Sequence, residues 1–186
     1  MRFYRFIALA MVLFSCISCS LLHRQPRVFV PALPTARDQF VLAQRKESDR
    51  MIVDKRTAKY KIATRELISC YDQVASRFPD DRTYTPWARI RLAQLHMEQG
   101  EYRLAMRMDE AVLKDYGDLK APDAQARYLK GVIYERMGKK TQAQEAYRDC
   151  MEHYKDSDDQ EAKNTAAKCQ ALYDRVFTVG EKSKRK

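Results

Sequence analysis

Residues 131–147, GVIYERMGKKTQAQEAY, decide how this chain folds. Gly138 stands between two runs of helix-forming residues, which predicts a helix, a tight turn and a second helix. Gly131 supplies a small surface on the first of these helices, while Tyr134 and Tyr147 supply rings. Because small residues let helices approach closely and rings fill the space between them, the stretch predicts a packed helical hairpin.

The same arrangement occurs 38 residues earlier in the chain. The earlier positions are Ala93, His96, Gly100 and Ala105. Three rings share the spacing, and each precedes a polar turn: Phe78, Tyr116 and Tyr154. A fixed period of this length is typical of repeat architectures. The helices that it predicts are residues 86–99, 102–116, 122–137, 140–153 and 159–177.

These positions resemble the tetratricopeptide repeat (TPR) over roughly residues 63–177. Gly131, Tyr134, Gly138, Ala143 and Tyr147 fit the family pattern, whereas Asp109 replaces the aromatic residue in the preceding repeat. The resemblance implies an all-α, TPR-like solenoid of helix-turn-helix repeats. It would hold about two full repeats, an N-terminal helical half-repeat and a C-terminal closing helix.

The period of 38 exceeds the usual ~34 residues. Together with the N-terminal sequence described below, it is similar to the repeats of bacterial envelope proteins. The two groups that it resembles are the outer-membrane β-barrel assembly lipoprotein and the accessory protein of the Tol–Pal system.

Composition excludes several other classes of protein. The 186 residues are one domain's worth, and 5 Gly and 6 Pro are too few for a turn-rich barrel or a glycine-dependent phosphate loop. Only the N-terminus is strongly apolar, which excludes a multi-span membrane protein. Most of the net charge of +10 lies in residues 23–66 and 181–186, with Arg2 and Arg5 adding to it, while residues 67–180 are close to neutral.

The N-terminus is predicted to be a secretory signal, because Arg2 and Arg5 precede a short apolar run. The following Leu-Phe-Ser-Cys-Ile-Ser-Cys resembles the lipobox of bacterial lipoproteins, with Cys19 or Cys16 as the lipidated residue. The alternative is an ordinary cleaved signal peptide. Neither residue after these cysteines is the aspartate that the resemblance links to inner-membrane retention. We therefore expect a lipid anchor on the periplasmic face of the outer membrane.

The chain divides into five predicted segments. They are a lipoprotein signal peptide (1–18), an extended tether with three prolines (19–35), a charged N-terminal helix (36–62), TPR-like helical repeats (63–178) and a basic tail (179–186). Residues 35–78 lack both Gly and Pro, which predicts helix, and we expect a break near residues 55–60.

No catalytic residues, metal site or cofactor are predicted. His23, His96 and His153 have no nucleophile or carboxylate at a recognisable motif spacing. The acidic run at residues 156–161 is interpreted as the cap of the last helix, with Ser157 or Asp158 accepting backbone N–H groups.

Two cysteines could meet in the envelope, an oxidising compartment. The repeat register places Cys150 on a second helix and Cys169 at the small position of the next first helix. A Cys150–Cys169 disulfide is one hypothesis. The alternative is that these cysteines, with Cys70, are small buried hydrophobic residues.

The concave face of the repeats is the candidate binding site. In the family this face is built from the first helix of each repeat. The register places eight residues there: Trp87, Ile90, Gln94, Met97, Gln125, Tyr128, Val132 and Glu135. They do not include the Lys/Asn clamp that some members use for a C-terminal carboxylate. An apolar and aromatic groove favours an extended or helical peptide segment, unless several of these residues are core.

The function predicted from these features is a non-enzymatic, lipid-anchored scaffold that docks a protein partner in the cell envelope. Outer-membrane assembly is one setting for such a scaffold. The alternative is a binder of anionic lipid or glycan through the basic stem and tail. Neither nucleic acid nor a small-molecule substrate is expected, since the repeat body offers no basic groove.

Overall fold

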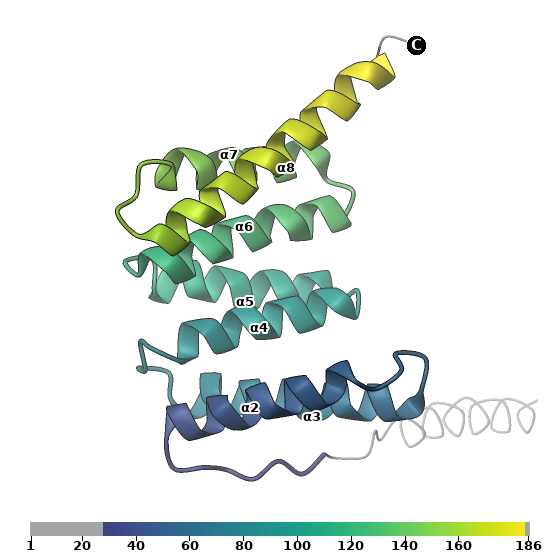
Figure 1. The fold of residues 1–186 in the computed structure, drawn as a ribbon, viewed down its shortest axis with the longest axis vertical. Helices are drawn as coiled ribbons and strands as arrows, with labels where there is room; N and C mark the ends of the chain where they lie inside the picture. The colour runs from purple at the N-terminus through teal and green to yellow at the C-terminus, as the bar shows by residue number, and fades with distance from the viewer. Residues whose placement is uncertain (1–27, 185–186) are drawn as a thin grey trace, which may run out of the picture.

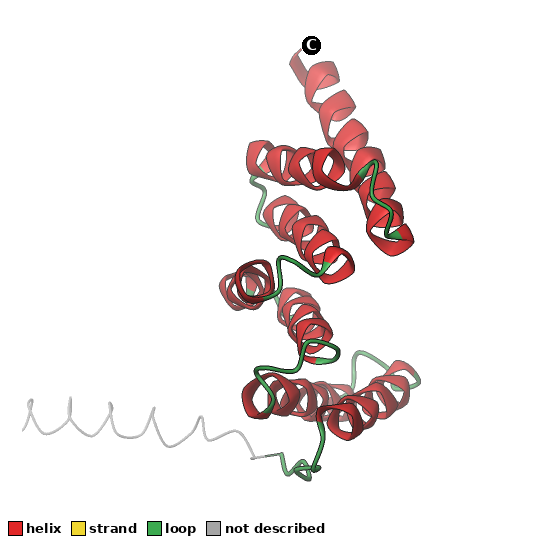
Figure 2. Cartoon of the chain, turned by 90° about the vertical axis from the view of Figure 1, so that its left-hand side faces the viewer, coloured by secondary structure: helices red, strands yellow, loops and turns green. Residues whose placement is uncertain are grey.

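The computed structural model describes residues 28–184 of the chain. Within this range the chain forms seven α-helices and no strand (Figures 1 and 2). In chain order the helices are α2 (Ala36–Met51), α3 (Ala58–Arg77), α4 (Thr85–Glu98), α5 (Tyr102–Asp115), α6 (Lys120–Arg136), α7 (Lys140–Tyr154) and α8 (Gln160–Lys184). The signal peptide, Cys16, Cys19, the first part of the tether and the last two residues lie outside the described residues.

The helices stack as pairs, which confirms the prediction of an all-α repeat solenoid. α2 packs on α3, α4 on α5 and α6 on α7, and α8 closes the stack against α6 and α7 (Figure 1). Four predicted helices begin and end within two residues of α4, α5, α6 and α7, while α8 runs past the predicted end at residue 177 to Lys184. The C-terminal part of α8 projects away from the stack (Figure 1).

α2, which the sequence predicts as a separate charged helix, packs on α3 and completes the N-terminal half-repeat. The expected break lies at residues 52–57, and Thr57 then caps α3 by accepting a hydrogen bond from the Tyr60 N–H at 3.2 Å. The predicted division between residues 62 and 63 falls inside α3. α2 therefore acts as the first helix of a third pair.

Part of the predicted tether packs on the first pair. Val30 is buried, and its carbonyl accepts a hydrogen bond from the Gln73 side chain at 3.0 Å. The carbonyl of Leu33 accepts one from Arg77 at 2.9 Å, and the N–H of Leu33 donates to Gln39 at 2.8 Å. Residues 28–33 form neither helix nor strand, and the contacts of Val30 and Leu33 hold this segment against α2 and α3 (Figure 1).

Turns between the paired helices depend on two glycines with positive φ. Gly100 has φ +77° and Gly138 has φ +74°, in the left-handed region that L side chains rarely adopt. At the start of α8 the Ser157 hydroxyl accepts the Asp159 N–H at 3.1 Å, as expected, and Asp159 in the same acidic run accepts the N–H of Ala162 at 2.9 Å.

Small residues recur every 38 positions where the helices cross. Ala93, Gly131 and Cys169 are all buried on the first helices α4, α6 and α8. A Cβ atom added at Gly131 would lie 2.3 Å from Cε1 of Tyr147, far inside van der Waals contact. The absence of a side chain at this position is therefore what lets the Tyr147 ring lie against α6.

Two arginines on first helices also recur 38 residues apart. Arg89 on α4 pairs with Asp115 on α5, and Arg127 on α6 pairs with Asp149 on α7. The hydroxyl of Tyr154 at the end of α7 donates to the Asp123 carboxylate on α6 at 2.6 Å in a buried contact. The pairs α4–α5 and α6–α7 are thus each joined by an arginine as well as by apolar packing.

One buried carboxylate breaks the apolar pattern. Asp109 is fully buried, and neither of its oxygens has a hydrogen-bond partner among the described residues. Burial raises the pKa of Asp109 well above its ordinary value, and Lys130 opposes this shift only in part. A carboxylate here costs folding free energy when it is ionised.

The Gly131→Ala change is expected to destabilise the fold. Alanine favours helix over glycine by up to ~1 kcal/mol, but overpacking a core costs about 1–3 kcal/mol, and the overlap with Tyr147 is severe. We expect a net loss of about 1–2 kcal/mol in the free energy of unfolding, measured by urea denaturation. In a Tyr147→Leu background the same change should cost less. An equal cost in both backgrounds would contradict the proposed overlap.

The Asp109→Asn change is expected to stabilise the protein at neutral pH. Since the folded pKa of Asp109 is raised, its contribution to stability is most favourable below the ordinary value of 3.8 and is lost as the pH rises through the folded pKa. We expect a gain of about 1 kcal/mol or more at pH 7. Denaturation between about pH 4 and pH 8 should show this gain shrinking toward low pH. A gain that does not depend on pH would contradict the assignment.

Candidate functional site

The candidate site is a small groove where α2, α4 and α6 meet. Its volume is about 240 Å³. The residues that line it are Glu47, Arg91, Gln94, Leu95, Met97, Glu98, Tyr128, Leu129 and Val132. Leu95 and Leu129 are almost fully buried and form its base, while Met97, Tyr128 and Val132 are half-buried.

Four of the eight groove residues predicted from the sequence lie here. Gln94 and Met97 come from α4, and Tyr128 and Val132 come from α6. The structure brings the two predicted sets together because α6 contacts α4 directly. Burial raises the pKa of the Tyr128 hydroxyl, so this side chain stays neutral and presents a ring with a hydrogen-bonding tip.

Ile90 does not line the groove. It is 2% exposed and belongs to the core formed by α4, α5 and α6, so it packs behind the surface. This corrects the expectation for Ile90, which the register had placed on the concave face. Trp87 is half-buried and packs against the same core.

The other two predicted residues lie on α6 outside the groove. Gln125 is half-buried there. The Glu135 carboxylate already accepts two hydrogen bonds within the fold, from the Tyr147 hydroxyl at 2.9 Å and from Arg175 on α8 at 2.7 Å. Glu135 therefore links α6, α7 and α8.

Glu47 and Arg91 are the main residues that sequence reasoning missed. Glu47 lies on α2 and accepts a hydrogen bond from the Tyr71 hydroxyl at 2.8 Å. Its carboxylate also lies 3.9 Å from the guanidinium of Arg91, which joins α2 to α4. A signal existed: Ala36, Phe40, Ala43 and Glu47 are spaced by four, three and four, which is the stripe of a packed helix.

The groove mouth is polar and its interior is apolar. Arg91 donates to the Gln94 side chain at 2.9 Å, and Glu47 and Glu98 add carboxylates at the rim. Among the described residues, no group of three or more His, Cys, Asp or Glu side chains could hold a metal ion. The arrangement suits recognition of a chain segment, with apolar anchoring inside and hydrogen bonding at the rim.

Cys150 and Cys169 lie in one buried cluster, where α7 packs on α8. Both are free thiols in the structure, as is Cys70. The pKa of the Cys169 thiol is raised, mainly by a hydrogen bond with Cys150 and also by burial. The predicted disulfide is thus compatible with their placement and stays a prediction.

Comparison with known families agrees with this geometry. A family model described as a tetratricopeptide repeat-like domain matches residues 56–174. The chain belongs to the tetratricopeptide repeat-like family. Members of this family are generally non-enzymatic scaffolds that bind protein partners. The match begins just before α3, so α2 and its Glu47 lie outside it.

Two further findings concern similarity to other proteins and the membrane. No curated protein matches the chain. Of the helices in residues 28–184, none is long and apolar enough to cross a membrane.

Proposed function

We propose that this chain is a lipid-anchored scaffold of the bacterial cell envelope that docks a protein partner in the groove between α2, α4 and α6. The observation that carries the proposal is the half-buried apolar lining of Met97, Tyr128 and Val132 on a buried leucine base. An aromatic side chain in such a setting is the residue type most often found at the centre of protein interfaces.

The size and chemistry of the groove favour a peptide segment over a small molecule. Its volume of about 240 Å³ lies below the ~300–1,000 Å³ of ordinary small-molecule sites. It would hold one anchoring apolar side chain of the partner, while Glu47, Arg91 and Gln94 pair with its backbone at the rim. The positions of the Lys/Asn clamp hold Ile90, Gln94, Tyr128 and Val132, so recognition would not depend on a terminal carboxylate.

The envelope setting is supported by the N-terminal sequence. Arg2 and Arg5, the apolar run and the two candidate cysteines are features of a lipoprotein signal. Two or more acyl chains hold a protein stably on a membrane. Outer-membrane assembly is the setting that the resemblance to envelope repeat proteins favours.

Replacing Tyr128 tests the groove. We expect Tyr128→Ala to lower recovery of the partner by about tenfold or more, because it removes a central aromatic anchor. Tyr134→Ala is the matched control, since Tyr134 is also half-buried on α6 but lines a different surface, with Leu113 and Ala146. The measurement is crosslinking in the native host, detergent solubilisation, capture of the tagged protein and quantitative mass spectrometry. Thermal unfolding of both variants reports whether they fold.

The outcomes separate the alternatives. Enrichment of β-barrel assembly or Tol–Pal components that depends on Tyr128 would support the proposal and choose between the two envelope settings. Equal losses in both variants, or a Tyr128→Ala variant that unfolds, would contradict it by making Tyr128 a core residue. Recovery of lipid or glycan alone would favour the alternative binder.

Replacing the two N-terminal cysteines tests the anchor. We expect the Cys16→Ala/Cys19→Ala protein to leave the membrane fraction, because the acyl chains would have no attachment site. Fractionation followed by immunoblotting measures this, and the two single variants identify the lipidated cysteine. A double variant that stays with membranes would contradict lipid anchoring and leave the groove proposal untouched.

A further inference from the structure

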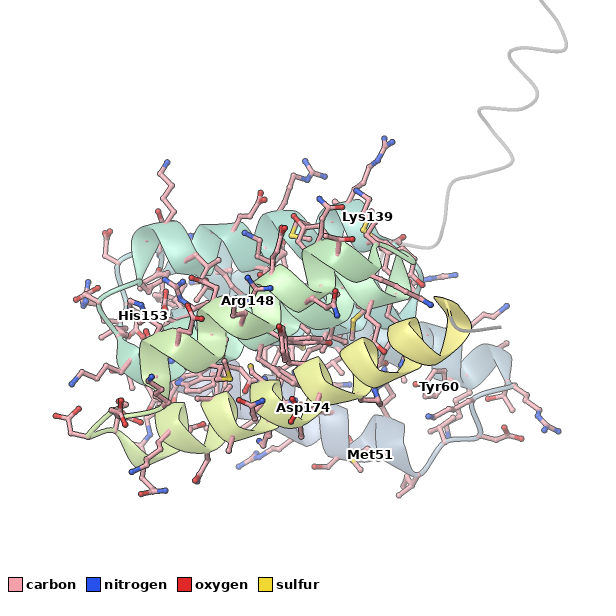
Figure 3. The ribbon with its side chains drawn as sticks, turned by 90° about the horizontal axis from the view of Figure 1, so that it is seen from above. Met51, Tyr60, Lys139, Arg148, His153 and Asp174 are labelled. Atoms are coloured by element: carbon pink, nitrogen blue, oxygen red, sulfur yellow. The ribbon has the colours of Figure 1, made fainter. Side chains whose placement is uncertain are left out.

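A second, larger cleft lies along one side of the stack, at the helix ends where α2 turns into α3 and α4 turns into α5 (Figure 1). We call it the end cleft. Its volume is about 1130 Å³, and its lining comes from α2, α3, α4, α5 and the last turn of α6. Figure 3, which looks down the stack, shows Met51 and Tyr60 on the first pair of helices, with Tyr60 toward the side of the molecule opposite His153.

Cations outnumber carboxylates in the end cleft. Five lining residues are Lys or Arg: Arg50, Lys55, Lys61, Arg65 and Arg136. Glu98 and Glu101 are the two acidic ones, and each is already paired: Glu98 with Arg50 at 2.9 Å, and Glu101 with His96 at 2.7 Å. Among the described side chains, Lys55, Lys61, Arg65 and Arg136 have no carboxylate within salt-bridge distance.

Arg50 anchors this charge inside the fold. Its side chain is 8% exposed, and one guanidinium nitrogen donates to Tyr60 at 3.1 Å and to Glu98 at 2.9 Å. Its Nε atom is buried without an acceptor among the described residues. A buried donor without a partner is costly, so an acceptor supplied by a ligand would be favoured here.

The N-terminus of α5 adds to the positive potential. Gly100, Glu101 and Tyr102 line the cleft, and α5 starts without a side-chain cap because Glu101 turns to His96 instead. The first N–H groups of a helix and its dipole attract negative charge. This contribution adds to that of the four unpaired cations beside it.

Exposed apolar side chains adjoin the end cleft along the chain. Met51, the last residue of α2, is 78% exposed and its C-cap Ile52 is 87% exposed, and both follow the lining residue Arg50. We call these two residues the apolar rim, and Ile62, which follows the lining residue Lys61 on α3, is 46% exposed. Large apolar side chains held this far into water at one place mark a contact surface. A cationic cleft beside an apolar rim calls for an occupant that carries both carboxylates and apolar side chains.

We propose that the end cleft binds an acidic segment of a partner protein, with aspartate and glutamate side chains inside and apolar side chains on the Met51–Ile52 rim. The cleft exceeds the ~300–1,000 Å³ of small-molecule sites, so a length of chain fits it better than a metabolite. A flat bilayer surface would contact the exposed Lys55 and Lys61 but would not reach the buried guanidinium of Arg50. This site adjoins the α2–α4–α6 groove, with which it shares the lining residues Met97 and Glu98, but it does not rest on the proposed function of the groove.

Binding of a synthetic peptide tests the proposal. The probe is a fluorescein-labelled peptide of alternating glutamate and leucine, and the control probe replaces every glutamate by glutamine. We expect saturable fluorescence anisotropy with the acidic probe and at least about tenfold weaker binding of the control. The protein variant is Lys55→Glu/Lys61→Glu, which should also weaken binding of the acidic probe by at least about tenfold.

The chain offers a matched control for charge alone. Arg56 and Lys59 are exposed on the same loop and helix but do not line the cleft. Arg56→Glu/Lys59→Glu changes the net charge by the same amount and should retain affinity within about threefold, since these exposed side chains do not line the cleft and would interact with the peptide only through solvent. The Tyr128→Ala variant should bind the probe normally, which distinguishes failure of this site from failure of the groove.

Three results would overturn the proposal. The first is no binding of the acidic probe by the unaltered protein, and the second is an equal loss in the two charge-reversed variants. The third is binding to vesicles of phosphatidylglycerol and phosphatidylcholine that displaces the peptide and depends on Lys55 and Lys61, which would assign the site to anionic lipid instead.

Discussion

The close approach of paired helices is the constraint on which the rest of this structure depends. It requires a small residue at one position of each first helix, and Ala93, Gly131 and Cys169 meet this requirement every 38 residues. At Gly131 the Tyr147 ring occupies the space that a Cβ atom would need. Because close crossing fixes how each pair lies on the next, it also fixes where α4 and α6 meet. The groove is thus a consequence of core packing, with side chains such as Tyr128 facing the space that the packing leaves.

Much of the repeat region could be predicted because its signals are local. The glycines at the turns and the rings before the polar loops follow one period, so α4 to α7 lie within two residues of their predicted bounds. The pairing of α2 with α3 could not be predicted from the repeat. α3 has 20 residues, and the 38-residue period does not continue through it to α2. The buried position of Ile90 was also not predicted. The repeat register indicates which residues share one face of a helix, but the neighbouring helices determine whether that face points to the core or to solvent. The contacts of Arg89 and Arg127 with their partner helices depend on the packed geometry in the same way.

The two surfaces of the molecule differ in chemistry as well as in place. The groove between α2, α4 and α6 is small, apolar inside and nearly balanced in charge at its rim. The end cleft is several times larger, and its cations exceed its carboxylates. Arg50 and Glu98 lie between them and tie α2 to α4, so the same ion pair supports both surfaces. A scaffold with two such sites could hold two segments of one partner or two partners at once, and binding of both would be strengthened by their proximity.

Site-specific photo-crosslinking is the most direct test of the central claim that a protein segment occupies the groove. A photoreactive amino acid would replace Gln94, which lines the groove on α4, and in a second protein Arg107, which is exposed on α5. The account predicts a discrete protein adduct in the native host from position 94 and none from position 107. Adducts of equal yield from both positions, or only lipid adducts from position 94, would contradict it.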